Sequence, residues 1–284
     1  MSVKIISDST CDLSPELIER YNIHIVPLHI VLGEQEYQDG VGITPDEIYA
    51  WSNENNAPPK TSALGIEEAV EAFRPYLEQG MDIVCFSISQ CMSTTINVMR
   101  MAAQELNATD RITIINSKNL STGVGHLVIE AAIMAEEGKT KEEIKAHVCE
   151  LRPLVRASFV VDTLTFLHRG GRCSSVAAFA GSALRLHPRI GVADGKMAAG
   201  KKYMGNMQKV IMTYTKEMEA DLLAAKPDRV FITHSGCSEE IIASVREYLE
   251  SLGHFSEILV TRAGGVISSH CGPNTLGVLF IAGE

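Results

Sequence analysis

The feature that most constrains the fold is a regular alternation of β-prone runs and helical segments through the first half of the chain. Runs rich in Val and Ile are followed by segments with helical spacing and a recognisable start signal. Thr44-Pro45-Asp46-Glu47, for example, combines a capping box with proline at the first helical position. This alternation predicts a mainly parallel sheet covered by helices. Strands are expected over 3–7, 23–32, 83–87 and 112–115, and helices over 15–21, from 44 toward 51, 66–78, 94–106, 123–137 and from 140 onward.

The pattern changes around residues 152–160, where strand-like runs come closer together and helices become fewer. We interpret this half as an α+β domain with a mixed or antiparallel sheet. Because 284 residues exceed the usual size of one domain, two domains are expected, over 1–153 and 154–284, with a ligand cleft between them. Strands are expected over 157–162, 189–192, 210–213, 229–233, 257–260 and 278–281, and helices over 174–185, 215–225 and 238–252.

The charge balance and the cysteines narrow the possible functions. The net charge of −10 argues against a general nucleic-acid binder and against binding to an anionic membrane. No run of 18 apolar residues predicts a membrane span, and the N-terminus lacks the pattern of a signal peptide. The seven cysteines form no C-x-x-C pair, as expected for reduced thiols in the cytoplasm rather than disulfides or a zinc site.

Polar clusters follow several predicted strands of the first half, where ligands bind in open α/β sheets. "ISQCMSTT" (88–95) leads into a helix and puts Ser93 at or near its N-cap, which suits a carboxylate or phosphate. Thr61 and Ser62 precede the helix expected at 66. The plain alternative is that these hydroxyls only cap helices. Asp8 and Asp12 in "DSTCD" lack the further carboxylates that a metal site needs, so no metal is expected.

Two clusters in the second half also carry chemistry. "HRGGRCSS" (168–175) combines two glycines with two arginines, a pattern that suits an anion or a partner. "SSHCGPNT" (268–275) is expected to be a turn between an incoming apolar run and a buried strand. A turn needs only Gly, Pro and Asn, so His270 and its hydroxyl neighbours indicate a further role.

Taken in order, these clusters resemble the DegV family of bacterial fatty-acid-binding proteins. The likeness covers nearly the whole chain. The matching stretches are "IISDSTCDL" (5–13), "YQDGVGITPDEIY" (37–49), "KTSALG" (60–65), "FSISQCMSTT" (86–95), "INSKNLSTGVG" (115–125), "DTLTFLHRGGR" (162–172), "THSGCSEE" (233–240) and "HCGPNTLG" (270–277).

The resemblance implies a carrier without catalytic residues or a cofactor of its own, which encloses one long-chain fatty acid between its domains. It implies that hydroxyls and a histidine hold the carboxylate, while the acyl chain lies in an apolar tunnel. Some members are the lipid-carrying subunit of a fatty acid kinase, in which a separate subunit phosphorylates the bound carboxylate. The residues that the resemblance assigns to ligand binding are Thr61, Ser62, Ser93, Thr94, Arg172, His270 and Gly272.

The chain departs from the family pattern at two places that matter. The stretch "L-S-G-T-Y" reads Met92-Ser93-Thr94-Thr95-Ile96, and Met204 stands where many members have an arginine. The second departure bears on coupling to a kinase more than on lipid binding. Two other functions stay open: a hydrolase or acyltransferase that uses Ser93 or Cys91 with His270, and a transferase that binds a phosphorylated metabolite at the helix start 93–95.

Overall fold

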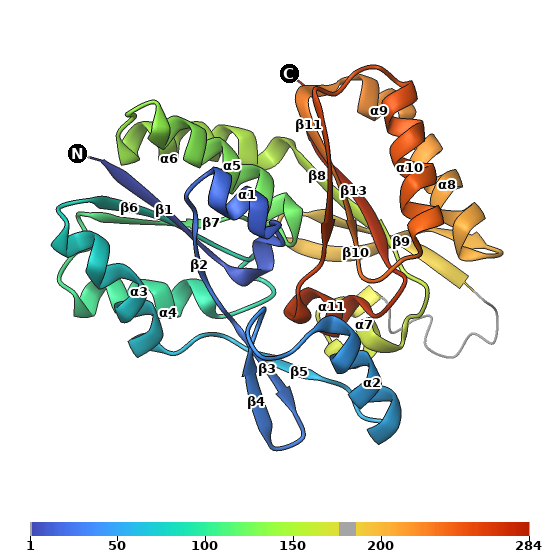
Figure 1. Ribbon diagram of the computed structural model, residues 1–284, viewed down its shortest axis with the longest axis horizontal. Helices are drawn as coiled ribbons and strands as arrows, with labels where there is room; N and C mark the ends of the chain where they lie inside the picture. The colour runs from blue at the N-terminus through green and yellow to red at the C-terminus, as the bar shows by residue number, and fades with distance from the viewer. Residues whose placement is uncertain (1, 176–185, 284) are drawn as a thin grey trace.

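A computed structural model describes residues 2–175 and 186–283. The first half contains a parallel four-stranded sheet of order β2-β1-β6-β7 with helices on both faces (Figure 1). This confirms the predicted parallel architecture. The elements are β1 (Val3–Asp8), α1 (Pro15–Arg20), β2 (His24–Val26), α3 (Ile66–Glu78), β6 (Asp82–Ser87), α4 (Thr95–Glu105), β7 (Ile112–Asn116), α5 (Thr122–Glu136) and α6 (Lys141–Leu151).

Alternating side chains bury both faces of this sheet. In β6, Ile83 and Cys85 pack with α3 and α4, whereas Val84 and Phe86 pack with α5 and α6. A strand buried on both sides needs a continuous apolar run, and β6 has one. The capping box predicted at Thr44 is present, and the helix expected from residue 140 also begins with a capping box at Thr140, so the start signals in the sequence define these helices well.

A small antiparallel sheet of order β4-β3-β5 extends from the first half together with α2 (Pro45–Asn55). Its strands are β3 (His29–Leu32), β4 (Gln35–Gln38) and β5 (Lys60–Ser62). The single strand expected over 23–32 is therefore wrong. The chain leaves the main sheet after Val26, because Pro27 has no N–H for a further ladder bond, and re-forms a strand in a different sheet.

The second half contains a six-stranded mixed sheet of order β10-β9-β8-β13-β11-β12, in which only β11 and β12 pair in parallel. This confirms the predicted mixed sheet. Its elements are η2 (Arg152–Leu154), β8 (Val155–Val160), α7 (Thr165–Gly170), β9 (Leu186–Ala193), β10 (Lys196–Met204), α8 (Met207–Glu217), α9 (Glu219–Leu223), β11 (Ala225–His234), α10 (Glu239–Ser251), β12 (Glu257–Arg262), α11 (Gly265–Cys271) and β13 (Leu276–Ala282).

Two predicted elements of this half differ from the structure. The strand expected over 210–213 lies inside α8, because Asn206 caps that helix and Val210, Ile211 and Tyr214 share its buried face. The helix expected over 215–225 is divided between the end of α8 and α9, and β11 already begins at Ala225. Of the helix expected over 174–185, residues 176–185 lie outside the described residues.

Helix α5 lies between the two large sheets. It packs on β1 of the parallel sheet and on β8 and β13 of the mixed sheet, and every residue of its first three turns is buried. The imidazole of His126 contacts the backbone carbonyl of Leu279 at 3.0 Å. One apolar cluster therefore runs from the first half into the second. The expected division into domains after residue 153 stays a prediction.

Candidate functional site

The candidate site is a cavity of about 350 Å³ lined by both halves of the chain. Its walls come from β5 and the residue after it, the β6–α4 loop, Leu120 before α5, Arg172, Met197 on β10, and α11. This volume lies within the range of small-molecule sites. We call this cavity the cleft.

Helix α11 supplies four lining residues of the cleft: Val266, Ile267, His270 and Cys271. The turn expected over 268–275 is therefore only partly correct, because its first residues are helical and the turn begins at Gly272. Apolar residues before Ser268 and a glycine after Cys271 allow a short buried helix here, and its brevity explains why the helical pattern is hard to detect.

Two buried carboxylates of the first half hold the start of α11. The N–H of Gly264 donates to Oδ1 of Asp12 at 2.8 Å, and that of Gly265 donates to Oδ1 of Asp39 at 2.6 Å. These bonds satisfy N–H groups that a helix leaves free at its first turn. Burial raises the pKa of Asp12 to about 8, and hydrogen bonds from Ser121 and Gly264 oppose this rise. The position of α11 thus depends on residues 226 and 252 places away in the chain.

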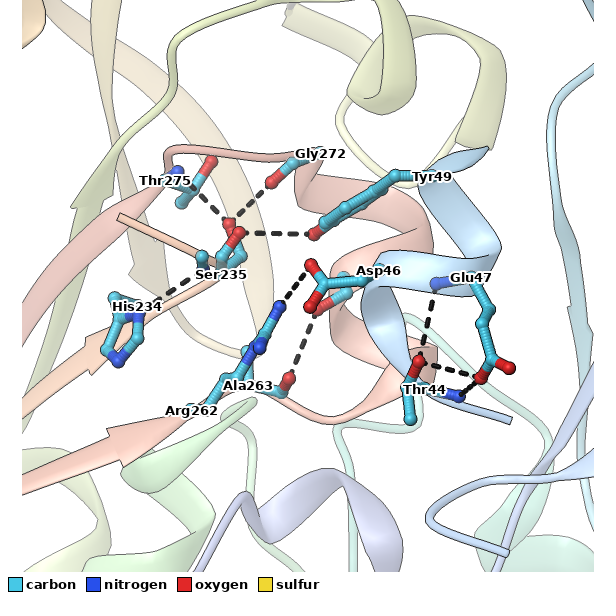
Figure 2. A network of polar contacts seen from close by, with 12 residues as sticks. Thr44, Asp46, Glu47, Tyr49, His234, Ser235, Arg262, Ala263, Gly272 and Thr275 are labelled. Atoms are coloured by element: carbon cyan, nitrogen blue, oxygen red, sulfur yellow. Dashed lines mark hydrogen bonds and ion pairs between the residues drawn. The ribbon is translucent and has the colours of Figure 1, made fainter. Parts of the chain in front are cut away.

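A polar network on another side of α11 ties the second half to α2 (Figure 2). Ser235 is its centre: its hydroxyl donates to the carbonyl of Gly272 and accepts from the N–H of Thr275 at 3.0 Å. Arg262 forms an ion pair with Asp46 at 2.5 Å, and the figure shows this pair beside the ring of Tyr49. The carbonyl of Ser235 accepts a hydrogen bond from the hydroxyl of Tyr49 on α2 at 3.5 Å, so the first half contacts the residue that holds the turn after α11.

The imidazole of His270 faces the cleft and contacts the small sheet. Its Nε2 lies 2.8 Å from Oγ1 of Thr61 on β5. The residue as a whole is partly exposed, but its Nδ1 is buried and has no hydrogen-bond partner among the described residues. Burial, with a smaller contribution from Arg172, lowers the pKa of His270 to about 4. The ring is therefore neutral near pH 7, with one N–H to donate.

Ser93 and Thr94 line the cleft at the start of α4. The hydroxyl of Ser93 lies 2.8 Å from that of Thr95 and accepts the Thr95 N–H at 3.2 Å. Ser93 thus closes the turn before the helix, near the N-cap as expected, while the N-cap Thr94 makes no side-chain cap bond. The start of α4 carries the partial positive charge of a helix N-terminus.

Ser62 and Arg172 line the outer part of the cleft. Ser62 is exposed, and its hydroxyl donates to Glu36 at 3.4 Å. Arg172 is the one charged side chain among the described residues of the cleft wall, and its guanidinium donates to the carbonyl of Gly170 at 2.7 Å. It also lines an adjoining opening of about 450 Å³, together with Lys196. Positive charge therefore marks the entrance rather than the interior.

Gly272 does not line the cleft. It has φ of +76°, and a side chain there would come within 2.7 Å of the ring of Phe166. Glycine is needed at this position because the backbone turns away from α11 in a conformation that other residues rarely adopt. Its place in the structure is thus the turn that ends α11, and the ligand contact expected of Gly272 stays a prediction.

Apart from Gln90, the remainder of the cleft wall consists of apolar residues and cysteines, and motifs in the sequence did not indicate most of it. Leu28, Met92, Leu120, Met197 and Ile267 all contribute. A small cavity of about 20 Å³, which we call the extension, lies between α11 and the mixed sheet, and Leu120, Ile267 and Cys271 line both it and the cleft. Val266 and Ile267 could have been found from their position beside His270, but Met197 belongs to no polar motif.

The described residues form no hydrolytic triad and no metal site. Ser93 bonds Thr95 rather than His270, and no carboxylate contacts the free nitrogen of His270. No group of three or more His, Cys, Asp or Glu in the described ranges could hold a metal ion. In the same ranges, no helix is both long and apolar enough to span a membrane.

Comparison with known proteins relates nearly the whole chain to one protein family. Residues 2–283 match the family model described as "Uncharacterised protein, DegV family". A DegV domain-containing protein of Clostridium perfringens is 32% identical over 279 residues, which is 98% of either chain. The structure of a DegV family protein from Thermus thermophilus, described for its fatty acid binding, is 33% identical with a TM-score of 0.91, and covers 99% of this chain and 100% of that one. A stearic acid-binding protein from Eubacterium ventriosum is 28% identical with a TM-score of 0.84, over 99% of this chain and 98% of that one.

Proposed function

The chain belongs to the DegV family, and from this premise we propose that it binds one long-chain fatty acid in the cleft. The observation that carries the proposal is the division of the cleft into two parts. Hydrogen-bonding groups gather around His270 and Ser93. Ser62, Gln90 and Arg172 add further polar groups, and the rest of the wall is mainly apolar. A molecule with a carboxylate and a long apolar chain matches both parts.

The carboxylate would lie among Thr61, Ser93 and His270. A carboxylate can accept several hydrogen bonds, and the hydroxyl of Ser93, the start of α4 and the Thr61–His270 pair can supply donors. The bond between Thr61 and His270 uses one of that pair's two hydrogens, so the pair offers one donor. Without such donors, burial of the charge would be costly. Arg172 at the entrance adds positive charge, which favours the anion before it is desolvated.

The acyl chain would follow the apolar wall past Met92 and Leu120. Beyond them, the extension is lined by Phe159 and Leu279. Each buried methylene contributes about 0.8 kcal/mol, so the chain supplies most of the affinity and the polar groups mainly fix its direction. The extension must widen to accept the end of a long chain, and Ile267 and Cys271 on α11 are the residues that would move.

Two related structures support this proposal. The Thermus thermophilus and Eubacterium ventriosum proteins are described as binding fatty acid and stearic acid, respectively, and both align over almost the whole chain. The ligand-binding roles of Thr61, Ser62, Ser93, Thr94, Arg172 and His270 are our proposal for this chain.

We further propose that a separate kinase subunit reaches the carboxylate through the opening beside Arg172. That opening also contains Lys196, so it offers positive charge to a phosphate being transferred. The exposed Met204 does not line the cleft, so its replacement of an arginine would affect docking of the kinase rather than lipid affinity. In this scheme the chain carries the substrate and the partner performs the chemistry.

Mass spectrometry of an organic extract of the natively purified protein tests the proposal. We expect about one fatty acid per chain, and much less in His270→Ala purified in parallel. A wild-type protein that holds no fatty acid and takes up none when it is added would refute the proposal. Circular dichroism of His270→Ala would show that the loss is not caused by unfolding.

A further inference from the structure

A second cavity, of about 470 Å³, shares no lining residue with the cleft. It lies at the junction of the two halves, between the β7–α5 loop, the start of β8 and the β9–β10 turn. We call it the junction groove and define it by Lys118, Arg152, Val155, Arg156, Val192 and Asp194.

The junction groove carries an excess of positive charge. Three cations, Lys118, Arg152 and Arg156, face one carboxylate, Asp194, which leaves two positive charges unbalanced. Lys118 and Asp194 are 3.8 Å apart and both exposed, so their attraction is weak and an anion can replace it. This excess stands out in a chain whose net charge is −10.

The two arginines are held in place but are not neutralised. Arg152 donates to the carbonyl of Asn116 at 3.0 Å, and Arg156 donates to that of Pro153 at 2.8 Å. Neither forms an ion pair with a carboxylate in the part of the chain that the structure describes. Each guanidinium has five N–H donors, so each keeps free donors for a ligand.

We propose that the junction groove binds a small organic phosphate. The planar fork of a guanidinium matches two phosphate oxygens, and a doubly charged phosphate ester would balance the two excess charges. The volume exceeds what a bare oxyanion needs and lies in the range of small-molecule sites. Val155 and Val192 provide an apolar surface for the organic part of the ligand.

Titration of the full-length, ¹⁵N-labelled protein with phenyl phosphate at constant ionic strength tests the site. We expect saturable shifts at the amides of Asn119, Val192 and Ala193, with a Kd in the millimolar range or below. Arg152→Met and Arg156→Met should each weaken binding about tenfold, the effect of losing a charge-assisted hydrogen bond. Arg156 is exposed, so Arg156→Met remains a valid test if loss of the Arg152–Asn116 bond destabilises the chain.

The control variant is Arg100→Met, which removes an exposed arginine of α4 whose one bond within the described ranges goes to the side chain of Asn97. It should leave the affinity unchanged. Shifts that do not saturate, or an affinity unaffected by both groove variants, would overturn the proposal. Equal affinity for inorganic phosphate would show that the groove does not recognise the organic part of the ligand, which would overturn the proposal of an organic phosphate. Tighter binding of a polyglutamate peptide than of phenyl phosphate would show that the groove binds an acidic protein segment rather than a small molecule.

Discussion

The imidazole of His270 lies directly against the α-carbon of Gly170. A methyl group at Gly170 would overlap Nδ1 of the ring and lie 3.2 Å from its Cε1. The two residues come from α11 and α7, which pack against each other. Gly170, the first glycine of "HRGGR", therefore leaves the space that the ring of His270 occupies.

Gly170→Ala should displace the ring of His270 and weaken fatty-acid binding about tenfold, the effect of losing one hydrogen bond to a charged group. The matched control is Gly171→Ala. Gly171 has φ of +67°, and no atom of the described residues lies within 4 Å of the place a side chain would take, so alanine there should cost about 1 kcal/mol of stability but spare the affinity. Calorimetric titration with a fatty acid distinguishes the two variants, and equal affinities would contradict the role given to Gly170.

Thr61→Val keeps the shape of the side chain and removes only the hydroxyl that contacts His270 at 2.8 Å. We expect affinity for fatty acid to fall about tenfold, because a donor to the carboxylate is lost. Thr213→Val is the control, since among the described residues its hydroxyl bonds only the carbonyl of Lys209, on the exposed face of α8. A displacement assay with a fluorescent fatty acid measures both, and an unchanged Thr61→Val would remove this hydroxyl from the site.

Asp39→Ala should lower both stability and affinity. It leaves the N–H of Gly265 and the hydroxyl of Ser9 without their acceptor, at a cost of about 1–3 kcal/mol for each buried group. It also frees the start of α11, so His270 loses its fixed position. Asp46→Ala breaks an exposed ion pair with Arg262 and should cost less than about 1 kcal/mol. Urea unfolding and fatty-acid titration of both variants provide the comparison.

His126 should make stability depend on pH. Burial lowers its pKa to about 4, whereas the unfolded chain has a value near 6.5. Below pH 6.5 the unfolded state therefore takes up the proton first, and the stability that the neutral ring provides is lost as pH falls toward 4.

His126→Gln isolates this effect, since the other titrating groups are common to both proteins. The difference in free energy of unfolding between wild type and variant should be constant above pH 7. Between pH 7 and pH 4 the wild type should lose roughly 3 kcal/mol of stability relative to the variant. A difference that stays constant from pH 7 to pH 4 would show that the pKa of His126 is the same in the folded and unfolded states.

The parallel half was predictable because its signals are local. Capping boxes at Thr44 and Thr140 and a continuous apolar run in β6 each define an element by neighbouring residues. The strand expected over 210–213 failed for the opposite reason. Val210 and Ile211 favour strands, but packing of their helical face on the mixed sheet outweighs that weak preference.

The cleft was predictable only in its polar part. Motifs indicated Thr61, Ser93, Arg172 and His270, and the structure brings all four to one cavity. Met197 could not be predicted, because the sequence does not show which cavity an apolar residue lines. Its place in the wall follows only once the pairing of β9 with β10 is known. The small sheet was missed because β5 is only three residues long and pairs with a strand about 30 residues earlier.

The position of α5 has a consequence for the order in which the chain can mature. During synthesis the parallel sheet and α5 are complete well before β11 and β13 leave the ribosome, because those strands begin only at Ala225 and Leu276. Until then the face of α5 that contacts Phe231 and Leu279 is exposed to water. We therefore expect the nascent first half to be prone to aggregation, and a truncated chain ending near residue 153 should need a chaperone or precipitate.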